Sequence, residues 1–78
     1  MADEPRTHLF IRVDDLAVPI AARNRLRDAG IIHVGDLVQK TEKELLYIRS
    51  FGKASVGRIK AVLSGLGLKL GMTIHDWP

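Results

Sequence analysis

The sequence contains no cysteine, which excludes disulfide bonds, thiol catalysis and thiolate zinc sites. Aromatic residues make up only 5% of it, with a single tryptophan. No apolar run approaches the roughly 18 residues that a membrane-spanning helix needs. The first residues are acidic and polar, unlike a secretory leader. These absences predict a cytoplasmic domain without membrane segment, metal or cofactor. At 78 residues there is room for one small domain with an economical core.

The charge is unevenly distributed along the chain. The formal net charge is +3, and no carboxylate occurs between residues 45 and 75. That stretch carries five cations: Arg49, Lys53, Arg58, Lys60 and Lys69. A second acid-free stretch, residues 16–27, carries Arg23, Arg25 and Arg27. If folding joins the two stretches into one face, an anionic partner is expected; the alternative is an ordinary solvated helix surface.

Periodicity predicts an all-α fold. Residues 1–12 contain Pro5 and no sustained period, so we expect a disordered lead-in before a folded domain over residues 13–78. Helices are predicted over residues 19–29, 37–40, 42–48 and 53–64. Their signals are Pro19 in a first turn, Gly30 as a left-handed cap, Asp36 as an N-cap, and a capping box between Thr41 and Glu44.

The expected architecture is a compact bundle of four to five short helices. Helix 53–64 has the clearest apolar face of the chain. The tail from Leu68 onward alternates apolar and polar residues and is predicted to be extended. Trp77 is expected to fold back onto the core, because it offers the largest single burial available.

Residues 48–55 carry the most informative motif. One helix ends, the chain is expected to turn tightly on Gly52, and a basic helix begins at once, which is the layout of a helix-hairpin-helix. A helix N-terminus leaves amide donors unpaired and carries about half a positive charge, which suits a phosphate. Lys53 adds a charge and Ser55 a hydroxyl donor. The alternative is that Gly52 only turns the chain between packed helices.

No enzyme is predicted. The three histidines lack metal-ligand spacing, and the Asp14-Asp15 pair is more typical of a cap than of acid–base chemistry. Ser50 and Lys53 match the S-x-x-K spacing of some acyl enzymes, but the accompanying motifs are missing. The glycines at 65 and 67 follow a predicted helix instead of a strand, so they do not form a dinucleotide loop.

From Val13 to Trp77 the sequence resembles the C-terminal domain of the bacterial RNA polymerase α subunit. The residues that carry the resemblance are Val13-Asp14-Asp15-Leu16, Asn24-Arg25-Leu26, residues 35–42 (Gly-Asp-Leu-Val-Gln-Lys-Thr-Glu), Glu44-Leu45-Leu46, Phe51-Gly52-Lys53, Leu68-Lys69-Leu70-Gly71-Met72 and Trp77. The resemblance implies a helical domain that binds the minor groove of A·T-rich DNA. It also implies contacts with sigma factor, activators or other RNA polymerase subunits.

Several of the family's functional positions are altered in this sequence. The groove-inserting arginine falls at Ala21 and a lysine at Ala54, while a glutamate becomes Arg58, a cysteine Arg25 and an asparagine Ser50. The asparagine, glycine and serine of the family's DNA face are kept as Asn24, Gly52 and Ser55. Among its protein-contact acids, Asp15 is kept and its neighbour is Ala17. These changes favour a divergent or free-standing relative; the alternative is an excised domain.

The resulting functional prediction is a non-enzymatic, nucleoid-associated DNA-binding module of transcription. It would contact the backbone and minor groove of A·T-rich DNA weakly and with strong salt dependence. The predicted nucleic-acid-binding residues are Asn24, Arg25, Gly52, Lys53, Ser55 and Arg58. The alternative is a protein-interaction module that docks on transcription machinery or a regulator, with DNA binding weakened or lost.

Overall fold

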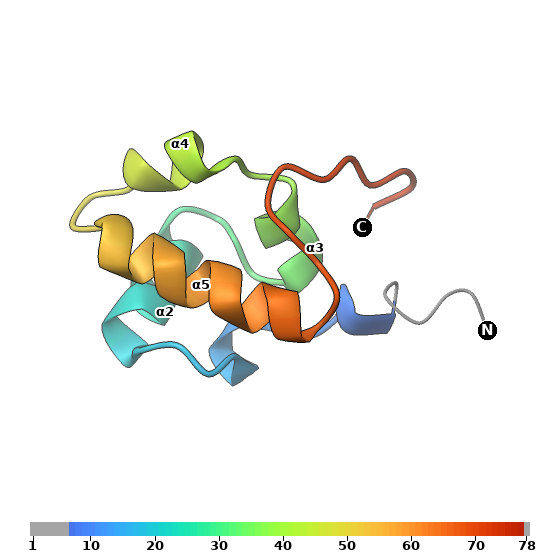
Figure 1. Ribbon diagram of the computed structural model, residues 1–78, viewed down its shortest axis with the longest axis horizontal. Helices are drawn as coiled ribbons and strands as arrows, with labels where there is room; N and C mark the ends of the chain where they lie inside the picture. Colours follow the sequence, from blue (N-terminus) through green and yellow to red (C-terminus); the bar gives the residue numbers. More distant parts are fainter. Residues whose placement is uncertain (1–6, 78) are drawn as a thin grey trace.

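The computed structural model describes residues 7–77 of the chain. In this part, one 3-10 helix and four α-helices are connected by short loops: η1 (Val13–Asp15), α2 (Ile20–Asp28), α3 (Val34–Val38), α4 (Glu42–Leu46) and α5 (Lys53–Gly65). Figure 1 shows α5 along one side of the molecule, with the tail crossing over α3. Across residues 7–77, strand-like pairing is limited to an isolated antiparallel bridge between Arg12 and His33. The predicted all-α bundle is therefore confirmed.

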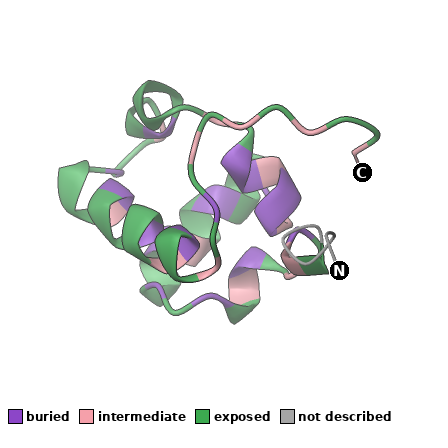
Figure 2. Cartoon of the chain, turned by 45° about the vertical axis from the view of Figure 1, so that its right-hand side comes forward, coloured by how far each residue is buried: buried purple, intermediate pink, exposed green. Residues whose placement is uncertain are grey.

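The core collects residues from every α-helix. Leu26 of α2, Leu37 of α3, Leu45 of α4, and Ile59 and Leu63 of α5 are all fully buried. Figure 2 shows these buried stretches facing the interior, while the outer faces of the helices are exposed. Full burial of one such side chain stabilises a fold by about 1.5–3 kcal/mol. The apolar residues that recur at helical spacing in the sequence are the ones that gain this stabilisation.

Local signals placed most helix boundaries within one or two residues. Gly30 follows α2 with φ of +83°, as the left-handed cap requires. At the start of α4, the Glu44 amide donates to Thr41 Oγ1 (3.1 Å), and the Thr41 amide donates to Glu44 Oε1 (2.8 Å). The capping box is thus confirmed. Its backbone hydrogen bond is the main reason that the pKa of Glu44 lies below the ordinary value.

The start of α3 differs from the prediction. His33 is the N-cap and Asp36 is the third helical residue, so the helix covers Val34–Val38 instead of residues 37–40. The cause is burial, because Val34 and Leu37 both belong to the core. Asp36 caps the helix from inside: its Oδ2 accepts the amides of His33 (3.0 Å) and Ile32 (3.2 Å).

The packed part of the chain begins before Val13. Residues 1–6 lie outside the described residues, but Leu9 is only 3% exposed and belongs to the core. The carbonyls of Leu9 and Ile11 accept the amides of Gly35 and Val34, respectively, at 2.9 and 2.8 Å. Within residues 7–12 the expectation of a disordered lead-in therefore does not hold. The short apolar run Leu9-Phe10-Ile11 is too brief to show a helical period, and the long-range contacts reveal its role.

The tail folds back as predicted. The amides of Gly71 and Met72 donate to the carbonyls of Lys40 and Val38, respectively, at 2.9 and 2.8 Å. Further along, the half-buried Trp77 donates its indole N–H to Asp36 Oδ1 at 2.7 Å. Its ring centroid lies 5.1 Å from that of Phe10. The tail, α3 and residues 9–11 thereby form one tightly connected end of the molecule.

Candidate nucleic-acid interface

The hairpin between α4 and α5 turns on Ser50 and not on Gly52. Ser50 has φ of +66°, in the left-handed region that few non-glycine residues adopt. Gly52 has φ of −119°, an extended conformation open to any residue, and serves as the N-cap of α5. The expected turn on glycine is therefore wrong in its position. A short hairpin needs one left-handed residue, and here the residue before Phe51 supplies it.

The N-terminus of α5 keeps backbone donors available. This end has no cap from a side-chain group, and its first backbone hydrogen bond is donated by Val56 to the Gly52 carbonyl at 3.1 Å. The amides of the first turn before Val56 carry the positive end of the helix dipole. A Cβ added at Gly52 would meet no atom within 4 Å, so the space beside the N-cap residue is open.

A hollow joins this junction to α2. Its volume is about 150 Å³, and its lining comes from the N-terminal half of α2, the hairpin and the first turn of α5: Pro19, Ala21, Ala22, Arg25, Ser50, Phe51 and Ser55. Residues 30 positions apart in sequence thus share one concave surface. Of the six predicted site residues, Arg25 and Ser55 meet in this hollow, and Gly52 lies at its edge in the chain between Phe51 and α5.

The other three predicted residues do not line this hollow. Asn24 lines a separate hollow of about 200 Å³, whose lining also includes Asp14, Arg23 and Arg27. Arg58 is exposed three residues after Ser55, which places it on the same side of α5. Lys53 is exposed at the first position of α5 and lines neither hollow. The structure therefore brings Arg25 and Ser55 together in one hollow whose lining does not include Lys53.

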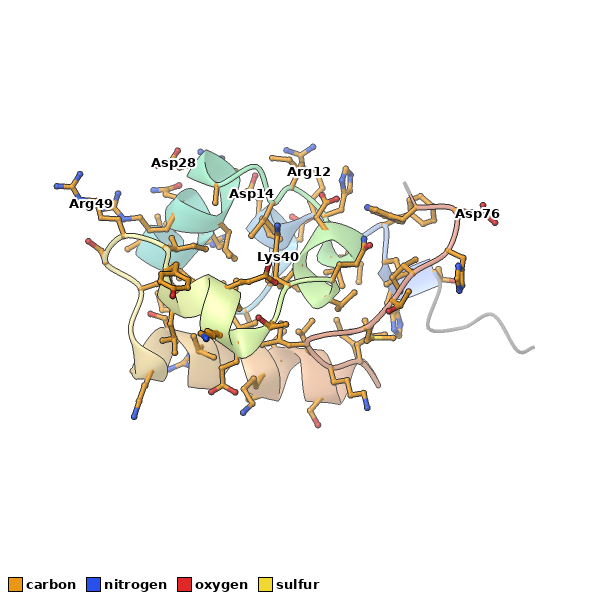
Figure 3. All side chains as sticks on the ribbon, turned by 90° about the horizontal axis from the view of Figure 1, so that it is seen from above. Arg12, Asp14, Asp28, Lys40, Arg49 and Asp76 are labelled. Atoms are coloured by element: carbon orange, nitrogen blue, oxygen red, sulfur yellow. The ribbon has the colours of Figure 1, made fainter. Side chains whose placement is uncertain are left out.

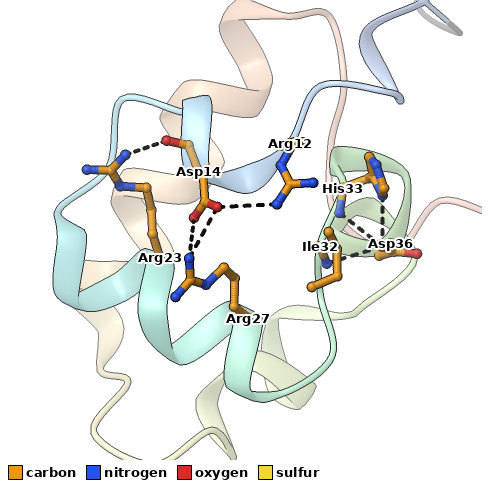
Figure 4. Close-up of polar contacts among 7 residues, drawn as sticks. All are labelled: Arg12, Asp14, Arg23, Arg27, Ile32, His33 and Asp36. Carbon is orange, nitrogen blue, oxygen red and sulfur yellow. Dashed lines mark hydrogen bonds and ion pairs between the residues drawn. The ribbon is translucent and has the colours of Figure 1, made fainter.

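Two of the three arginines of α2 are engaged elsewhere. Arg27 pairs with the Asp14 carboxylate (Nη1–Oδ2 3.3 Å), and Arg12 approaches the same oxygen at 3.6 Å. Arg23 donates to the Asp14 backbone carbonyl. Figure 4 shows Arg12 and Arg27 reaching this carboxylate from two different directions. Only Arg25, of the arginines in α2, faces the hairpin, so the expected joined basic face is narrower than the charge distribution predicts.

A further cation is neutralised on the opposite flank. Lys60 of α5 pairs with Glu42 of α4 at 3.2 Å, which holds its charge on the α4 side. Sequence reasoning missed both pairings. The signal for the first was the acidic pair at residues 14–15 beside an arginine-rich helix, and no local signal marks the second. Within residues 7–77, no group of three or more metal-ligating side chains occurs.

Comparison with known proteins identifies the family. Residues 1–65 match the model of the family formed by the C-terminal domain of the bacterial RNA polymerase alpha chain. The protein belongs to this family. It is also similar to the NMR structure of the C-terminal domain of the RNA polymerase α subunit from Helicobacter pylori, with a TM-score of 0.76 and 28% identity. The alignment covers 96% of this chain and 65% of that one.

Membership in this family confirms the helical fold and the resemblance found in the sequence. The family is a non-catalytic part of the bacterial transcription machinery, which agrees with the prediction that the protein is not an enzyme. No helix among the described residues is long and apolar enough to span a bilayer. Ala21, at the position where the resemblance places a groove arginine, lines the hollow beside the hairpin. The altered position is thus part of the candidate interface.

Proposed function

We propose that the protein is a DNA-binding module of bacterial transcription that contacts the backbone and minor groove of A·T-rich DNA. Arg25, Ser55 and Arg58 would meet phosphates around the hollow, Asn24 and Lys53 would extend the contact, and the amides after Gly52 would bind one phosphate directly. A cytoplasmic, nucleoid-associated location belongs to the same proposal. So do contacts with sigma factor, activators or other RNA polymerase subunits, for which the exposed Asp15 remains a candidate.

One observation carries this proposal: Arg25 lines the same small hollow as Ser55, which belongs to the first turn of a helix without a side-chain cap. No ion pair within residues 7–77 involves Arg25 or Arg58. Free guanidinium groups and free amides are the donors that phosphates prefer, and they position a protein on DNA without reading its sequence. Because Ala21 has replaced the groove arginine, phosphate contacts supply most of the expected affinity.

The proposal is tested by measuring affinity for an A·T-rich duplex across about 50–200 mM salt. Each phosphate contact contributes about 0.9 to the slope of log K against log salt. Arg25→Ala and Arg58→Ala should therefore each flatten the slope by close to one unit. Lys60→Ala is the matched control, because Lys60 already pairs with Glu42 away from the hollow.

Equal slopes for Arg25→Ala and Lys60→Ala would overturn the proposed interface. The preference for A·T-rich DNA is tested by measuring affinity for a second duplex of the same length that is rich in G·C. If both duplexes bind equally, contact with the narrow minor groove is refuted, while a backbone-only interface remains. If neither duplex binds, the alternative of a protein-interaction module replaces DNA binding.

A further inference from the structure

A second concave surface lies between the C-terminal end of α2 and α4. Two adjoining hollows, of about 280 and 390 Å³, share Ala29 and Ile48 and so form one groove. The groove runs from Lys40 at one end to Arg25 at the other. We call this surface the α2–α4 groove. It is separate from the hollow at the hairpin, although Arg25 lines both.

The floor of the α2–α4 groove is apolar. Ile31 and Leu45 are buried beneath it, and Ile48 is half-buried. Tyr47, on the same lining, is 79% exposed, the largest exposure among the big apolar side chains in the described residues. Exposed aromatic side chains beside an apolar depression are typical of protein-binding surfaces, where tyrosine and arginine are frequent anchors.

The rim of the groove carries more available positive than negative charge. Its cations are Lys40, Arg25 and Arg49, and its acids are Asp28 and Glu44. No ion pair within residues 7–77 includes any of the three cations. Glu44 is held by the Thr41 amide at 2.8 Å, so its carboxylate is already partly compensated. Figure 3 shows Arg49 and Asp28 at the same end of the molecule, with Lys40 nearer the middle.

We propose that the α2–α4 groove docks a protein segment in which an aliphatic or aromatic anchor is flanked by carboxylates. The anchor would cover Ile48 and Ala29 beside Tyr47, and the carboxylates would face Arg49 and Lys40. A nucleic acid fits this surface poorly, because an apolar floor offers phosphates no partner and Asp28 at the rim repels them. The proposal does not depend on DNA binding.

The occupant is tested by panning a phage-displayed library of random 12-residue peptides against the full 78-residue protein. We expect the selected peptides to share one large apolar residue with Asp or Glu close by. Synthetic copies are then titrated into isotope-labelled protein, and the amides of Ala29, Ile31, Tyr47 and Ile48 should shift. A copy with Asp and Glu replaced by Lys should bind about tenfold more weakly.

A pair of variants locates the binding surface. Ala29→Glu places a charge in the middle of the groove at an exposed position, and we expect it to weaken peptide binding at least about tenfold. Ala61→Glu, at an exposed position of α5 that lines neither hollow of the groove, is the matched control and should change affinity less than about twofold. Thermal unfolding checks that both variants keep the fold.

Three results would overturn the proposal: selection yielding no binder, selected peptides rich in Lys and Arg, or shifts confined to residues outside the groove. Equal weakening by Ala29→Glu and Ala61→Glu would do the same. Failure of DNA binding is a separate outcome, since a wild-type protein that binds peptides but no duplex refutes only the proposed DNA contact. Tyr47→Ala sharpens this separation, because it should weaken the peptide and leave duplex affinity unchanged.

Discussion

The two ends of this small domain differ in whether their polar groups have hydrogen-bond or ion-pair partners within the protein. At the end formed by α3 and the tail, Asp36 accepts three hydrogen bonds, from the indole of Trp77 and the amides of His33 and Ile32. At the hairpin end, the first turn of α5 has no side-chain cap, and Arg25 has no ion-pair partner within the described residues. At the first end the polar groups are hydrogen-bonded within the protein, and at the hairpin end the donors remain available to a ligand.

This difference separates stability from binding. Satisfied hydrogen bonds and packed rings hold residues 9–11 and Trp77 against α3, so changes there should act on the free energy of unfolding. Free amides and cations contribute little to folding, so changes at the hairpin end should act on affinity. Three variants and one pH response test this separation. It would be contradicted if a change at the α3 end altered affinity, or if a change at the hairpin end altered the free energy of unfolding.

The largest effect is expected for Gly35→Ala. A Cβ at this position would lie 2.6 Å from Cη2 of Trp77, so the indole must move away from Asp36. We expect a loss of about 1–3 kcal/mol in the free energy of unfolding, measured by urea denaturation. Gly57→Ala is the control, because nothing lies within 4 Å of a Cβ there and removing a mid-helix glycine stabilises by about 0.5–1 kcal/mol. Equal stability of the two variants would show that the ring is loosely held.

The second prediction concerns acid. Partial burial raises the pKa of Asp36, but hydrogen bonds from Trp77, His33 and Ile32 together lower it below the ordinary 3.8. A carboxylate whose pKa is lower in the folded chain stabilises fully above its unfolded pKa and loses that contribution as pH falls through the folded value. Stability should therefore decline below about pH 4. Trp77→Phe removes the indole donor and moves the folded pKa of Asp36 toward its unfolded value, so the acid-induced loss of stability should become smaller.

Two measurements check this acid response. NMR titration of the Asp36 carboxyl carbon gives its pKa directly, and thermal unfolding between about pH 2 and 6 gives the stability profile. A pKa at or above 3.8 in the folded protein would contradict the hydrogen-bond arrangement at this end. DNA affinity at neutral pH should be unchanged in Trp77→Phe, provided that the variant is folded.

At the hairpin end, Ala21→Arg should strengthen binding. The side chain would start inside the hollow that Arg25 and Ser55 line and would reach toward the duplex. One good arginine contact contributes about 1–3 kcal/mol, so affinity for A·T-rich DNA should rise about tenfold. The gain should be smaller for a G·C-rich duplex, whose minor groove is wider. Unchanged affinity, measured by fluorescence anisotropy, would mean that this face of α2 does not contact DNA.

The smallest effect is expected for Gly52→Ala. The backbone there is extended and a Cβ meets no atom, so the fold should be unaffected. An added methyl group beside the uncapped amides should nevertheless hinder a phosphate and weaken DNA binding about threefold. A comparable loss in Gly57→Ala would attribute the change to helix propensity. A loss of stability in Gly52→Ala would contradict the extended geometry.

How much the sequence predicts depends on the range of the interactions involved. The capping box at Thr41 and the left-handed cap at Gly30 follow from neighbouring residues, and both are confirmed. The start of α3 was misplaced, because Asp36 reads as an N-cap locally while burial of Val34 extends the helix. The packing of Leu9 depends on contacts with α3, which is distant in the sequence.

The candidate site shows the same limit. The motif at residues 48–55 correctly indicates a helix end, a hairpin and a new helix. It does not reveal that Arg23 and Arg27 turn toward Asp14, since that pairing joins residues 9 to 13 positions apart. A count of arginines along α2 therefore overstates the charge that faces the hairpin. Spatial neighbours, and not composition, decide which cations remain available.

The left-handed conformation of Ser50 affects how rigidly the hairpin loop is held. Holding a residue other than glycine or asparagine at φ of +66° costs roughly 1–2 kcal/mol, so the loop is kept in one shape by its surroundings at some expense. Replacing Ser50 with glycine would remove that cost but would also enlarge the range of shapes open to the loop. If the hairpin binds DNA as proposed, the glycine variant would lose more conformational entropy on binding than the protein with Ser50, whose loop is already restricted.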